Sequence, residues 1–385
     1  MHILFVSSWF PDQNNPFNGN FVIKHAEAVA ILHKVSFISV TSSPLLDKSK
    51  LDMAPSVYMV EKVYKKCTLP FVGRLINKIR VISNYIKAYF QICKVQGTPH
   101  VVHANILYPI GLLALLIKII HGIPYVVSEH WTGYMDERGL CISSWKKILI
   151  RLIAYQSSYV CPVSISLGNA MRKIAPKADY KIVPNVVDVN LYKSKKKHNE
   201  FRFVHISSLN DEQKNISGIM ESVSLLTSKR LDFTFHFVTC GSIETFAQKA
   251  KIMKLEDKVF FHKHFTPLQI AQFLSESDCL VMFSRYETFG VVVIEAFAAG
   301  IPVIGTRVGV LSELVTPMSG FLVPSEDTIA LCKAMQQMME QINRFDSDAI
   351  RSSIIEHYSY NAVGQIFSDL YHKLDDKKGF KYPCA

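Results

Sequence analysis

The sequence predicts an α/β protein made of two Rossmann-like domains, each a doubly wound parallel sheet with helices on both faces. The first observation is length, since 385 residues are many for one hydrophobic core and natural for two domains. The second is the alternation of short β-branched segments with helix-like segments through both halves. The third is the segment from Cys279 to Ile304, which reads as strand, loop, helix and strand and therefore implies parallel strands.

The first half opens on a strand and alternates from there. Met1–Ser8 has no basic leader, so we expect a strand there and not a signal peptide. The apolar stretch Ile106–Ile120 is shorter than the about 20 residues that a bilayer span needs. The expected strands are His2–Ser7, Val35–Val40, His100–Ala104, Tyr125–Ser128, Tyr159–Val163 and Lys181–Val183. The expected helices are Phe21–Lys34, Val72–Val95, Ile110–His121, Trp145–Ser157 and Leu167–Ile174.

The second half repeats the alternation and predicts a second Rossmann-like domain. Its expected strands are Arg202–Ile206, Phe233–Val238, Lys258–Phe261, Asp278–Phe283, Pro302–Thr306 and Gly320–Val323. Its expected helices are Asn215–Leu226, Ile243–Met253, Pro267–Glu276, Gly290–Ala299 and Thr328–Ile342, with a last helix at Ala362–Leu374.

Composition excludes several classes of protein. A chain that is 49% hydrophobic and 19% charged is globular and not disordered. The eight cysteines form no C-x-x-C pair and no zinc spacing, which indicates free thiols in a reducing compartment. We therefore expect a cytoplasmic protein, soluble or peripheral to a membrane. Its formal net charge of +11 indicates that a surface bound by this protein would be anionic. We expect no nucleic acid among its partners.

Two carboxylates dominate the segment from Cys279 to Ile304. Glu287 lies in the expected loop and Glu295 in the second turn of the expected helix, so both can face the carboxyl edge of the sheet, where doubly wound folds bind ligands. Glu295 sits among apolar residues, and a carboxylate there must be paired or must serve a ligand. A carboxylate can accept two hydroxyls, which suits a sugar diol. The start of the helix at Phe289, Gly290 and Val291 offers free N–H groups to the same edge.

At these residues the chain resembles the retaining glycosyltransferases of family 4, which have the GT-B fold. Their signature is Glu-x7-Glu, then Ala and Gly-x-Pro-Val. The matching positions are Glu287, Phe289, Gly290, Glu295, Ala296, Gly300, Pro302 and Val303. The resemblance implies two Rossmann-like domains facing a central cleft. It implies transfer of a sugar from a UDP- or GDP-sugar to a hydroxyl of a glycan or lipid-linked acceptor, in cell-surface polysaccharide or glycolipid assembly.

The resemblance also implies roles for single residues. Glu295 would bind the ribose hydroxyls of the donor, and Glu287 the donor sugar together with the backbone of Phe289, Gly290 and Val291. Lys214 would bind the diphosphate. The family's arginine at this loop is replaced by Ser208, and Arg285 or Arg307 could supply the second charge. With the leaving group neutralised in this way, no metal and no cofactor is expected.

In the first half, the resemblance points to His130 as a catalytic residue beside the reacting carbon. His130 follows an expected strand and Glu129. Gly19 lies in a turn-rich loop, Pro16–Phe21, that resembles the glycine loop by which family members approach the diphosphate and acceptor. His103 also ends a strand, and a structural role is the more common one for a lone histidine there.

Domain limits follow from the same resemblance. Pro184–Asp188 resembles the family's segment at the domain boundary, so we expect a first domain of residues 1–188 and a second of residues 189–357, with residues 358–385 returning to the first. Lys193–Glu200 is expected to be a solvated linker rather than a basic binding patch. His262 and His264 together would suggest zinc, but the sequence provides no third ligand.

Other functions remain open. A GT-B sugar-nucleotide epimerase would share the donor site, and a non-catalytic sugar-nucleotide binding protein would show no turnover. A dinucleotide-dependent oxidoreductase would need G-x-G-x-x-G after a first strand, and neither half has it. The donor base, the sugar and the acceptor depend on loops such as Asn105–Tyr108 and Thr132–Cys141.

The stretch Glu61–Lys94 has two interpretations. It carries eight basic residues and one acid: Lys62, Lys65, Lys66, Arg74, Lys78, Arg80, Lys87, Lys94 and Glu61. Apolar residues recur at helical spacing from Val72 to Phe90. Either this apolar stripe packs on the domain core, or the stretch forms a basic, aromatic contact with an anionic membrane at its inner face.

Overall fold

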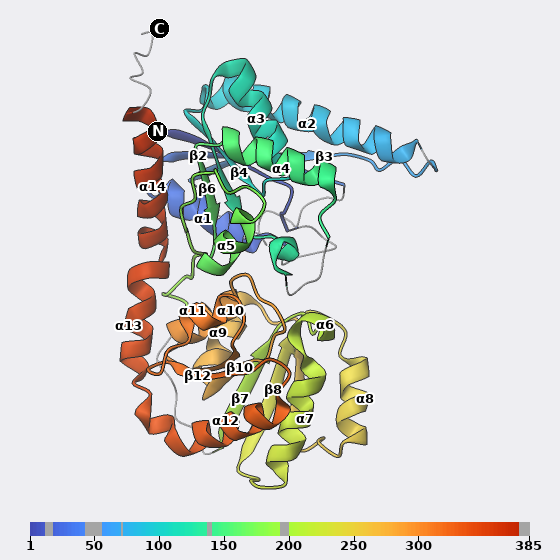
Figure 1. The fold of residues 1–385 in the computed structure, drawn as a ribbon, viewed down its shortest axis with the longest axis vertical. Coiled ribbons are helices and arrows are strands. Elements are labelled where there is room, and N and C mark those ends of the chain that lie inside the picture. The colour runs from blue at the N-terminus through green and yellow to red at the C-terminus, as the bar shows by residue number, and fades with distance from the viewer. Residues whose placement is uncertain (12–17, 43–55, 71, 137–140, 193–199, 377–385) are drawn as a thin grey trace. The chain divides into compact units, whose positions relative to one another are not determined.

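The computed structural model describes residues 1–11, 18–42, 56–70, 72–136, 141–192 and 200–376 (Figure 1). The expected linker residues 193–199 and the first part of the glycine loop lie outside the described residues. The chain forms two compact units. Unit 1 contains the residues up to Tyr134, the segment that ends at Val186 and the helix that begins at Tyr360, and unit 2 runs from Val187 to Ser359.

The sheet of unit 1 is parallel, in the order β3-β2-β1-β4-β5-β6. Its strands are β1 (His2–Ser7), β2 (Lys34–Thr41), β3 (Val57–Val63), β4 (Val101–Asn105), β5 (Tyr125–Glu129) and β6 (Tyr159–Pro162). β3 was not predicted, because an edge strand can carry charged residues such as Glu61 and Lys62 and then lacks an apolar run. No strand forms at Lys181–Val183, against the prediction. The segment follows an isolated bridge between Val160 and Tyr180, and the backbone N–H groups of Lys181 and Val183 donate to β6.

The helices of unit 1 cover both faces of this sheet. They are α1 (Asn20–Ala30), α2 (Gly73–Gln96), α3 (Ile110–His121), α4 (Ser144–Gln156), α5 (Ile165–Arg172) and α14 (Tyr360–Asp376), with a 3-10 turn η2 (Thr132–Tyr134) after β5. α2, α3 and α4 lie on one face, and α1 packs beside α14 on the other (Figure 1). Phe5 and Phe37 from the strands pack in one core with Phe367 and Tyr371 of α14, so the end of the chain completes the unit.

The sheet of unit 2 is also parallel, in the order β12-β11-β10-β7-β8-β9. Its strands are β7 (Phe201–Ile206), β8 (Phe233–Thr239), β9 (Val259–Lys263), β10 (Cys279–Met282), β11 (Val303–Thr306) and β12 (Gly320–Val323). All six predicted strands of this half are present, each with ends displaced by two residues or fewer.

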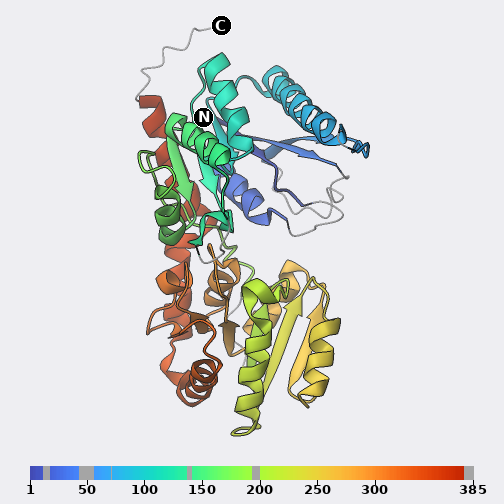
Figure 2. The same ribbon diagram turned by 45° about the vertical axis from the view of Figure 1, so that its right-hand side comes forward.

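Eight α-helices in the described part of unit 2 connect these strands or follow the last of them. They are α6 (Asp211–Lys214), α7 (Ile216–Thr227), α8 (Glu244–Ile252), α9 (Pro267–Ser275), α10 (Val291–Ala298), α11 (Leu311–Leu314), α12 (Thr328–Gln341) and α13 (Ser347–Tyr358), with a 3-10 turn η4 (Ile342–Arg344). α7 and α8 lie side by side on one face of the sheet in both views (Figure 2). α13, which was not predicted, packs on α10.

Parallel pairing brings the carboxyl ends of neighbouring strands to one edge in each unit. In unit 1, Asn105 at the end of β4 lies opposite Ser7 of β1 and Ser128 of β5. In unit 2, Met282 of β10 lies opposite Gly305 of β11. The predicted site residues follow these strand ends, as the position of ligand sites in doubly wound sheets requires.

Candidate functional site

The loop between β10 and α10 forms the first part of the candidate site. Gly290 is the N-cap of α10 and has φ of 67°, a left-handed conformation that glycine adopts without strain. A Cβ atom at Gly290 would lie 3.4 Å from Cγ of Glu287, so the loop folds closely on that carboxylate. The helix begins at Val291, one residue after its predicted start, and its first N–H groups have no partner within the helix itself.

Glu287 forms a buried ion pair with Lys214. Lys214 is the last residue of α6, the short helix after β7, and its Nζ donates a short hydrogen bond to Oε2 of Glu287. The two side chains are 13% and 7% exposed. The structure therefore brings together the residue predicted to bind the diphosphate and the residue predicted to bind the donor sugar, on loops that follow the adjacent strands β7 and β10.

The guanidinium of Arg285 holds this loop in place through hydrogen bonds and an ion pair. Its Nε lies 2.6 Å from Oε1 of Glu326, its guanidinium donates to the carbonyl of Asp211, and its Nη2 lies 2.9 Å from Oδ1 of Asn215. Its backbone N–H also donates to the Gln213 carbonyl at 2.8 Å. Arg285 thereby ties the turn that carries Lys214 to the loop after β10, and this leaves little of its guanidinium for a ligand.

Arg307 differs from Arg285. It follows β11, its side chain is exposed, and it forms no side-chain hydrogen bond or ion pair with the rest of the described chain. Ser208, at the position of the family's arginine, is exposed and uncharged. Of the two arginines expected to supply the second charge, Arg307 is therefore the one available to a ligand.

The other predicted donor residues lie on or next to α10. Glu295 is half-buried in the second turn of the helix and interacts with other residues of the protein. Phe289 is buried, with its ring centroid 6.1 Å from that of Tyr358 on α13. Its side chain therefore packs inside the unit, and only its backbone is left for the predicted contact with the donor.

In unit 1, Gly19 shapes the start of α1. It is the N-cap of the helix with φ of 75°, and a Cβ atom there would collide with the carbonyl of Trp9. Two residues later, the Phe21 ring lies 5.9 Å from Trp9 and 4.3 Å from the imidazole of His130. Gly19 and His130 are thus linked through Phe21 at the same edge of the sheet.

His130 is buried and has no hydrogen-bond partner for either ring nitrogen among the described residues. Burial, and then the neighbouring His25 and His103, hold the pKa of His130 well below its usual value of 6.5. The ring is therefore neutral near pH 7 and has one donor and one acceptor to offer. Buried polar atoms are nearly always paired in proteins, so this imidazole is suited to a ligand.

His103 has a structural role. Its Nδ1 lies 2.6 Å from the hydroxyl of Tyr371 and its Nε2 lies 2.8 Å from Oγ of Ser128. Both nitrogens are therefore satisfied inside the core, and the Phe5 ring packs against the imidazole with the ring centroids 4.3 Å apart. The interpretation of His103 as a structural residue is the one that the geometry supports.

Some buried polar residues without partners were not singled out from the sequence. The amide of Asn105, Nδ1 of His25 and Oγ of Ser284 have no partner among the described residues. Asn105 ends β4 and Ser284 follows β10, so both lie at the carboxyl edges. Polar residues that directly end an apolar strand are the signal that could have found Asn105 and Ser284.

The two histidines considered for zinc do not lie on one face of a strand. β9 ends at Lys263, and His264 has φ of 61°. Nε2 of His262 pairs with Nδ1 of His236 at 2.9 Å instead. Over the residues that the structure describes, no group of three histidine, cysteine or acidic side chains is placed to hold a metal ion.

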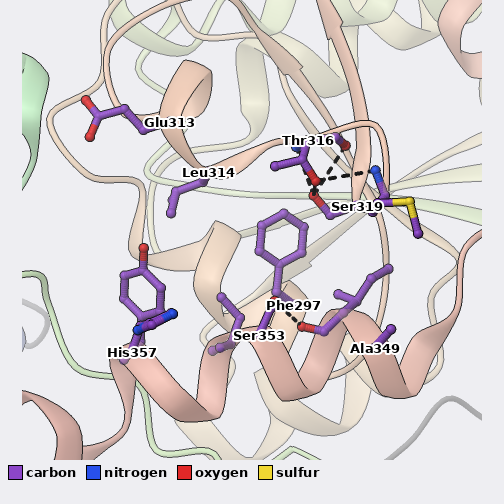
Figure 3. Close-up of a pocket in the computed structure, with 12 residues that line it drawn as sticks. Phe297, Glu313, Leu314, Thr316, Ser319, Ala349, Ser353 and His357 are labelled. Carbon is purple, nitrogen blue, oxygen red and sulfur yellow. Dashed lines mark hydrogen bonds between the residues drawn. The ribbon is translucent and has the colours of Figure 1, made fainter.

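A hollow of about 400 Å³ lies between α13, α10 and the loop before β12 (Figure 3). Phe297, Leu314 and Ile354 form much of its wall, and Glu313 and His357 reach its rim. None of the residues predicted to bind the donor lines it. Tyr358 lines the hollow and also contacts Phe289, which lies in the loop between β10 and α10.

Two family models match the chain, one in each half. Residues 19–191 match the model described as Glycosyltransferase Family 4, and residues 200–341 match the one described as Glycosyl transferases group 1. Among similar proteins, the N-acetyl-alpha-D-glucosaminyl L-malate synthase of Bacillus anthracis is 28% identical over 72% of this chain and 76% of its own length. The GDP-mannose:cellobiosyl-diphosphopolyprenol alpha-mannosyltransferase of Xanthomonas campestris is 25% identical over 67% of this chain and 70% of its own.

Solved structures share the fold along nearly the whole chain. Sucrose-phosphate synthase from Thermosynechococcus elongatus superposes with a TM-score of 0.78 at 17% identity, covering 98% of this chain and 100% of that one. HepE of Anabaena, in complex with UDP, gives a TM-score of 0.76 at 17% identity, covering 97% and 100%. In the described part of the chain, no helix is long and apolar enough to cross a membrane.

Proposed function

Because the chain is a glycosyltransferase with the GT-B fold, we propose that it transfers a hexose from a UDP- or GDP-sugar to a hydroxyl of a glycan or lipid-linked acceptor, with retention at the anomeric carbon. The observation that carries the proposal is the buried pair of Lys214 and Glu287 beside the Gly290 cap of α10. A cation, a carboxylate and free helical N–H groups at one strand edge suit a ligand that is both a diphosphate and a sugar.

Unit 2 is the proposed donor-binding unit. Lys214 binds the diphosphate as a point charge, and Arg307 supplies the second positive charge that the family's arginine would give. Glu295 accepts the two ribose hydroxyls. Glu287 and the backbone of Gly290 bind the sugar. The leaving group is neutralised by these cations and by the start of α10, so we propose that transfer needs no metal.

The proposed reaction takes place on one face of the sugar. The bond between the anomeric carbon and the β-phosphate oxygen breaks, and the acceptor oxygen forms its bond to the same face of that carbon. The departing phosphate oxygen takes the proton of the acceptor hydroxyl, so the products are a nucleoside diphosphate and a glycoside. A neutral His130 beside the reacting carbon can donate a hydrogen bond as charge develops.

Binding and turnover of nucleotide-sugars test this function. Thermal-shift screening of UDP-, GDP- and ADP-sugars identifies the donor, because a ligand that binds the native state raises apparent stability by mass action. NMR of the products then reports the anomeric configuration, and the assay is repeated with EDTA. Release of a 2-epimer of the sugar without an acceptor would indicate an epimerase instead. Binding without transfer or hydrolysis would indicate a non-catalytic protein.

We also propose that α2 contacts an anionic membrane surface, which places the acceptor at the inner face of a membrane. The alternative prediction, that the apolar stripe packs on the core, was wrong for the first half of α2. The buried side of the helix is formed by Tyr85, Ala88, Tyr89 and Ile92. Leu75, Ile79 and Ile82 are 60%, 58% and 54% exposed, next to exposed Arg74 and Lys78. Exposed apolar and basic side chains on one helix suit a lipid interface.

Co-sedimentation with vesicles tests the membrane contact. Each basic residue near an anionic surface contributes up to about 1 kcal/mol, so binding should be strong at low salt and weak at high salt. Changing Lys65, Lys66, Arg74 and Lys78 to Gln should abolish it. A matched control changes four exposed lysines of unit 2: Lys229, Lys251, Lys254 and Lys333. Equal loss in both variants would reduce the effect to net charge and remove the proposed role of α2.

A further inference from the structure

The carboxyl edge of unit 1 carries an amide with no partner. Asn105 is the last residue of β4 and is fully buried, and neither its Oδ1 nor its Nδ2 has a hydrogen-bond partner among the described residues. The imidazole of His130 is in the same condition. Leaving such groups unpaired costs free energy, and in native proteins they commonly serve a ligand or a buried water.

Asn105 and His130 face the same side of the sheet. Side chains two residues apart on a strand share a face, so Asn105 lies on the same face of the sheet as His103. His103 is hydrogen-bonded to Tyr371 of α14 on that face. Ser128, opposite Asn105, is also on this face because its Oγ bonds to His103. The His130 ring lies against Phe21 and His25 of α1, which covers this face with α14.

The carboxylate of Glu129 fixes the backbone around both residues. It accepts a hydrogen bond from the N–H of Leu107 at 2.9 Å, and from those of His130 and Trp131 at 3.0 Å each. Between Asn105 and Leu107, Ile106 has φ of 73°, a conformation that costs a β-branched residue free energy. One buried carboxylate thus holds a strained turn after β4 and the turn after β5.

The imidazoles of His25 and His130 are uncharged at neutral pH. Burial lowers the pKa of His25 to about 4, and burial keeps that of His130 well below 6.5. The only carboxylate bound into these turns is that of Glu129 among the residues described here. A hydroxyl can both donate to and accept from an amide and a neutral imidazole, so these two groups suit a neutral ligand.

We propose that Asn105 and His130 form a hydroxyl-binding site that recognises a neutral sugar or polyol as the acceptor, and that Glu129 is the positioning residue of this site. The inference rests on the proposed glycosyl transfer, and it assigns the chemical class of the acceptor.

Saturation-transfer NMR on the full chain tests the site with defined probes. D-glucose, D-mannose and myo-inositol are the neutral probes, and L-malate and inositol 1-phosphate are the anionic ones, each in the presence of UDP or GDP. We expect a neutral probe to bind the wild type, and Asn105→Ala to weaken it about tenfold, as loss of one hydrogen bond implies. Asn105→Asp, which preserves the side-chain volume, provides the same test if Asn105→Ala does not fold. Asn169→Ala, at an exposed position of α5, is the matched control and should change nothing.

Glu129→Gln tests the positioning role. It keeps the shape but replaces one accepting oxygen with a donor, so it should lower kcat and acceptor affinity together and leave nucleoside diphosphate affinity unchanged. Probe binding that is indifferent to Asn105, or preferential binding of the anionic probes in the wild type, would overturn the inference. If nucleotide-sugar is still bound and hydrolysed in that case, the proposed function stands and only the acceptor site is wrong.

Discussion

The carboxyl edges of the two sheets in this glycosyltransferase differ in the charge and pairing of their polar side chains. In unit 2 two cations are already paired, Lys214 with Glu287 and Arg285 with Glu326, while Arg307 is exposed. In unit 1 the polar groups of Asn105 and His130 are neutral and without partners in the described chain. The same fold, with the same strand order, thus presents a buried ion pair at one edge and neutral groups without partners in the described chain at the other.

The difference follows from what a buried group costs in each case. Burying an unpaired charge costs far more free energy than burying an unpaired amide or neutral imidazole. A buried charge that binds a charged ligand therefore needs a counter-ion in the ligand-free protein. In the proposed donor site, Lys214 would exchange Glu287 for the diphosphate. Asn105 and His130 have no partner in the described chain to exchange.

The largest effect is expected at the ion pair. Lys214→Ala leaves the carboxylate of Glu287 buried without its partner and should lower the free energy of unfolding by about 3–5 kcal/mol. It should also abolish measurable binding of nucleoside diphosphate. Chemical denaturation and calorimetry with UDP and GDP check the two effects.

The double variant Lys214→Met with Glu287→Gln separates the two effects of that change. Removing both charges should restore much of the stability, because no unpaired charge remains. Diphosphate binding should stay lost. Recovery of binding together with stability would mean that Lys214 acts only on the fold.

The next effect concerns the two glutamates. Glu295→Gln should weaken nucleotide and nucleotide-sugar alike by about 1.5–3 kcal/mol, because a charge-assisted bond to the ribose is lost. Glu287→Gln should spare the free nucleotide and reduce turnover. Titration of UDP, GDP and the matching sugar-nucleotide into both variants checks the split, and equal binding of nucleotide by wild type and a folded Glu295→Gln would refute the ribose assignment.

Both units should lose stability in mild acid. Burial lowers the pKa of His25 in unit 1 and of His205 in unit 2 to about 4, against 6.5 for a free histidine. The native state therefore binds fewer protons than the unfolded state below pH 6.5, and the free energy of unfolding should fall from there toward pH 4. At pH 5 each histidine should cost about 2 kcal/mol. His205→Gln should flatten the curve measured by denaturation, and an unchanged curve would count against this assignment.

The smallest effect separates Arg285 from Arg307, the two arginines proposed to supply the second charge. Arg307→Ala should weaken nucleoside diphosphate by about 1 kcal/mol and leave stability unchanged, since its side chain is exposed. Arg285→Ala should do the reverse, because its guanidinium holds the Lys214 turn. Thermal unfolding and diphosphate titration distinguish them. If Arg285→Ala alone lost affinity at full stability, the second charge would belong to Arg285.

Much of the fold could be predicted because its local signals are strong. Apolar strands bounded by glycine and proline, as around Gly300 and Pro302, locate both sheets. β3 was not predicted because this edge strand is half polar. α13 was not predicted because it has few apolar residues, of which Ile350 and Ile354 are buried. The exposed stripe of α2 was ambiguous because helical spacing does not tell which neighbour an apolar face meets.

Candidate site residues could be proposed from the sequence where a motif exists. Glu287, Gly290 and Lys214 were found from a family pattern, and the structure adds that two of them are paired. The choice between Arg285 and Arg307 needed coordinates, because it depends on which guanidinium is already bonded. Asn105 was only one residue of a specificity loop until its burial and its missing partners were visible.

Calorimetric titration of UDP and GDP into the full chain tests the contrast between the two edges most directly. Wild type, Lys214→Gln and Asn105→Ala are compared at one salt concentration, with uridine and guanosine as phosphate-free references. We predict that Lys214→Gln weakens the diphosphate at least about tenfold while sparing the nucleoside, and that Asn105→Ala changes neither. Diphosphate affinity that survives Lys214→Gln in a folded protein, or that falls with Asn105→Ala, would contradict the assignment of an ionic donor edge to unit 2 and an uncharged edge to unit 1.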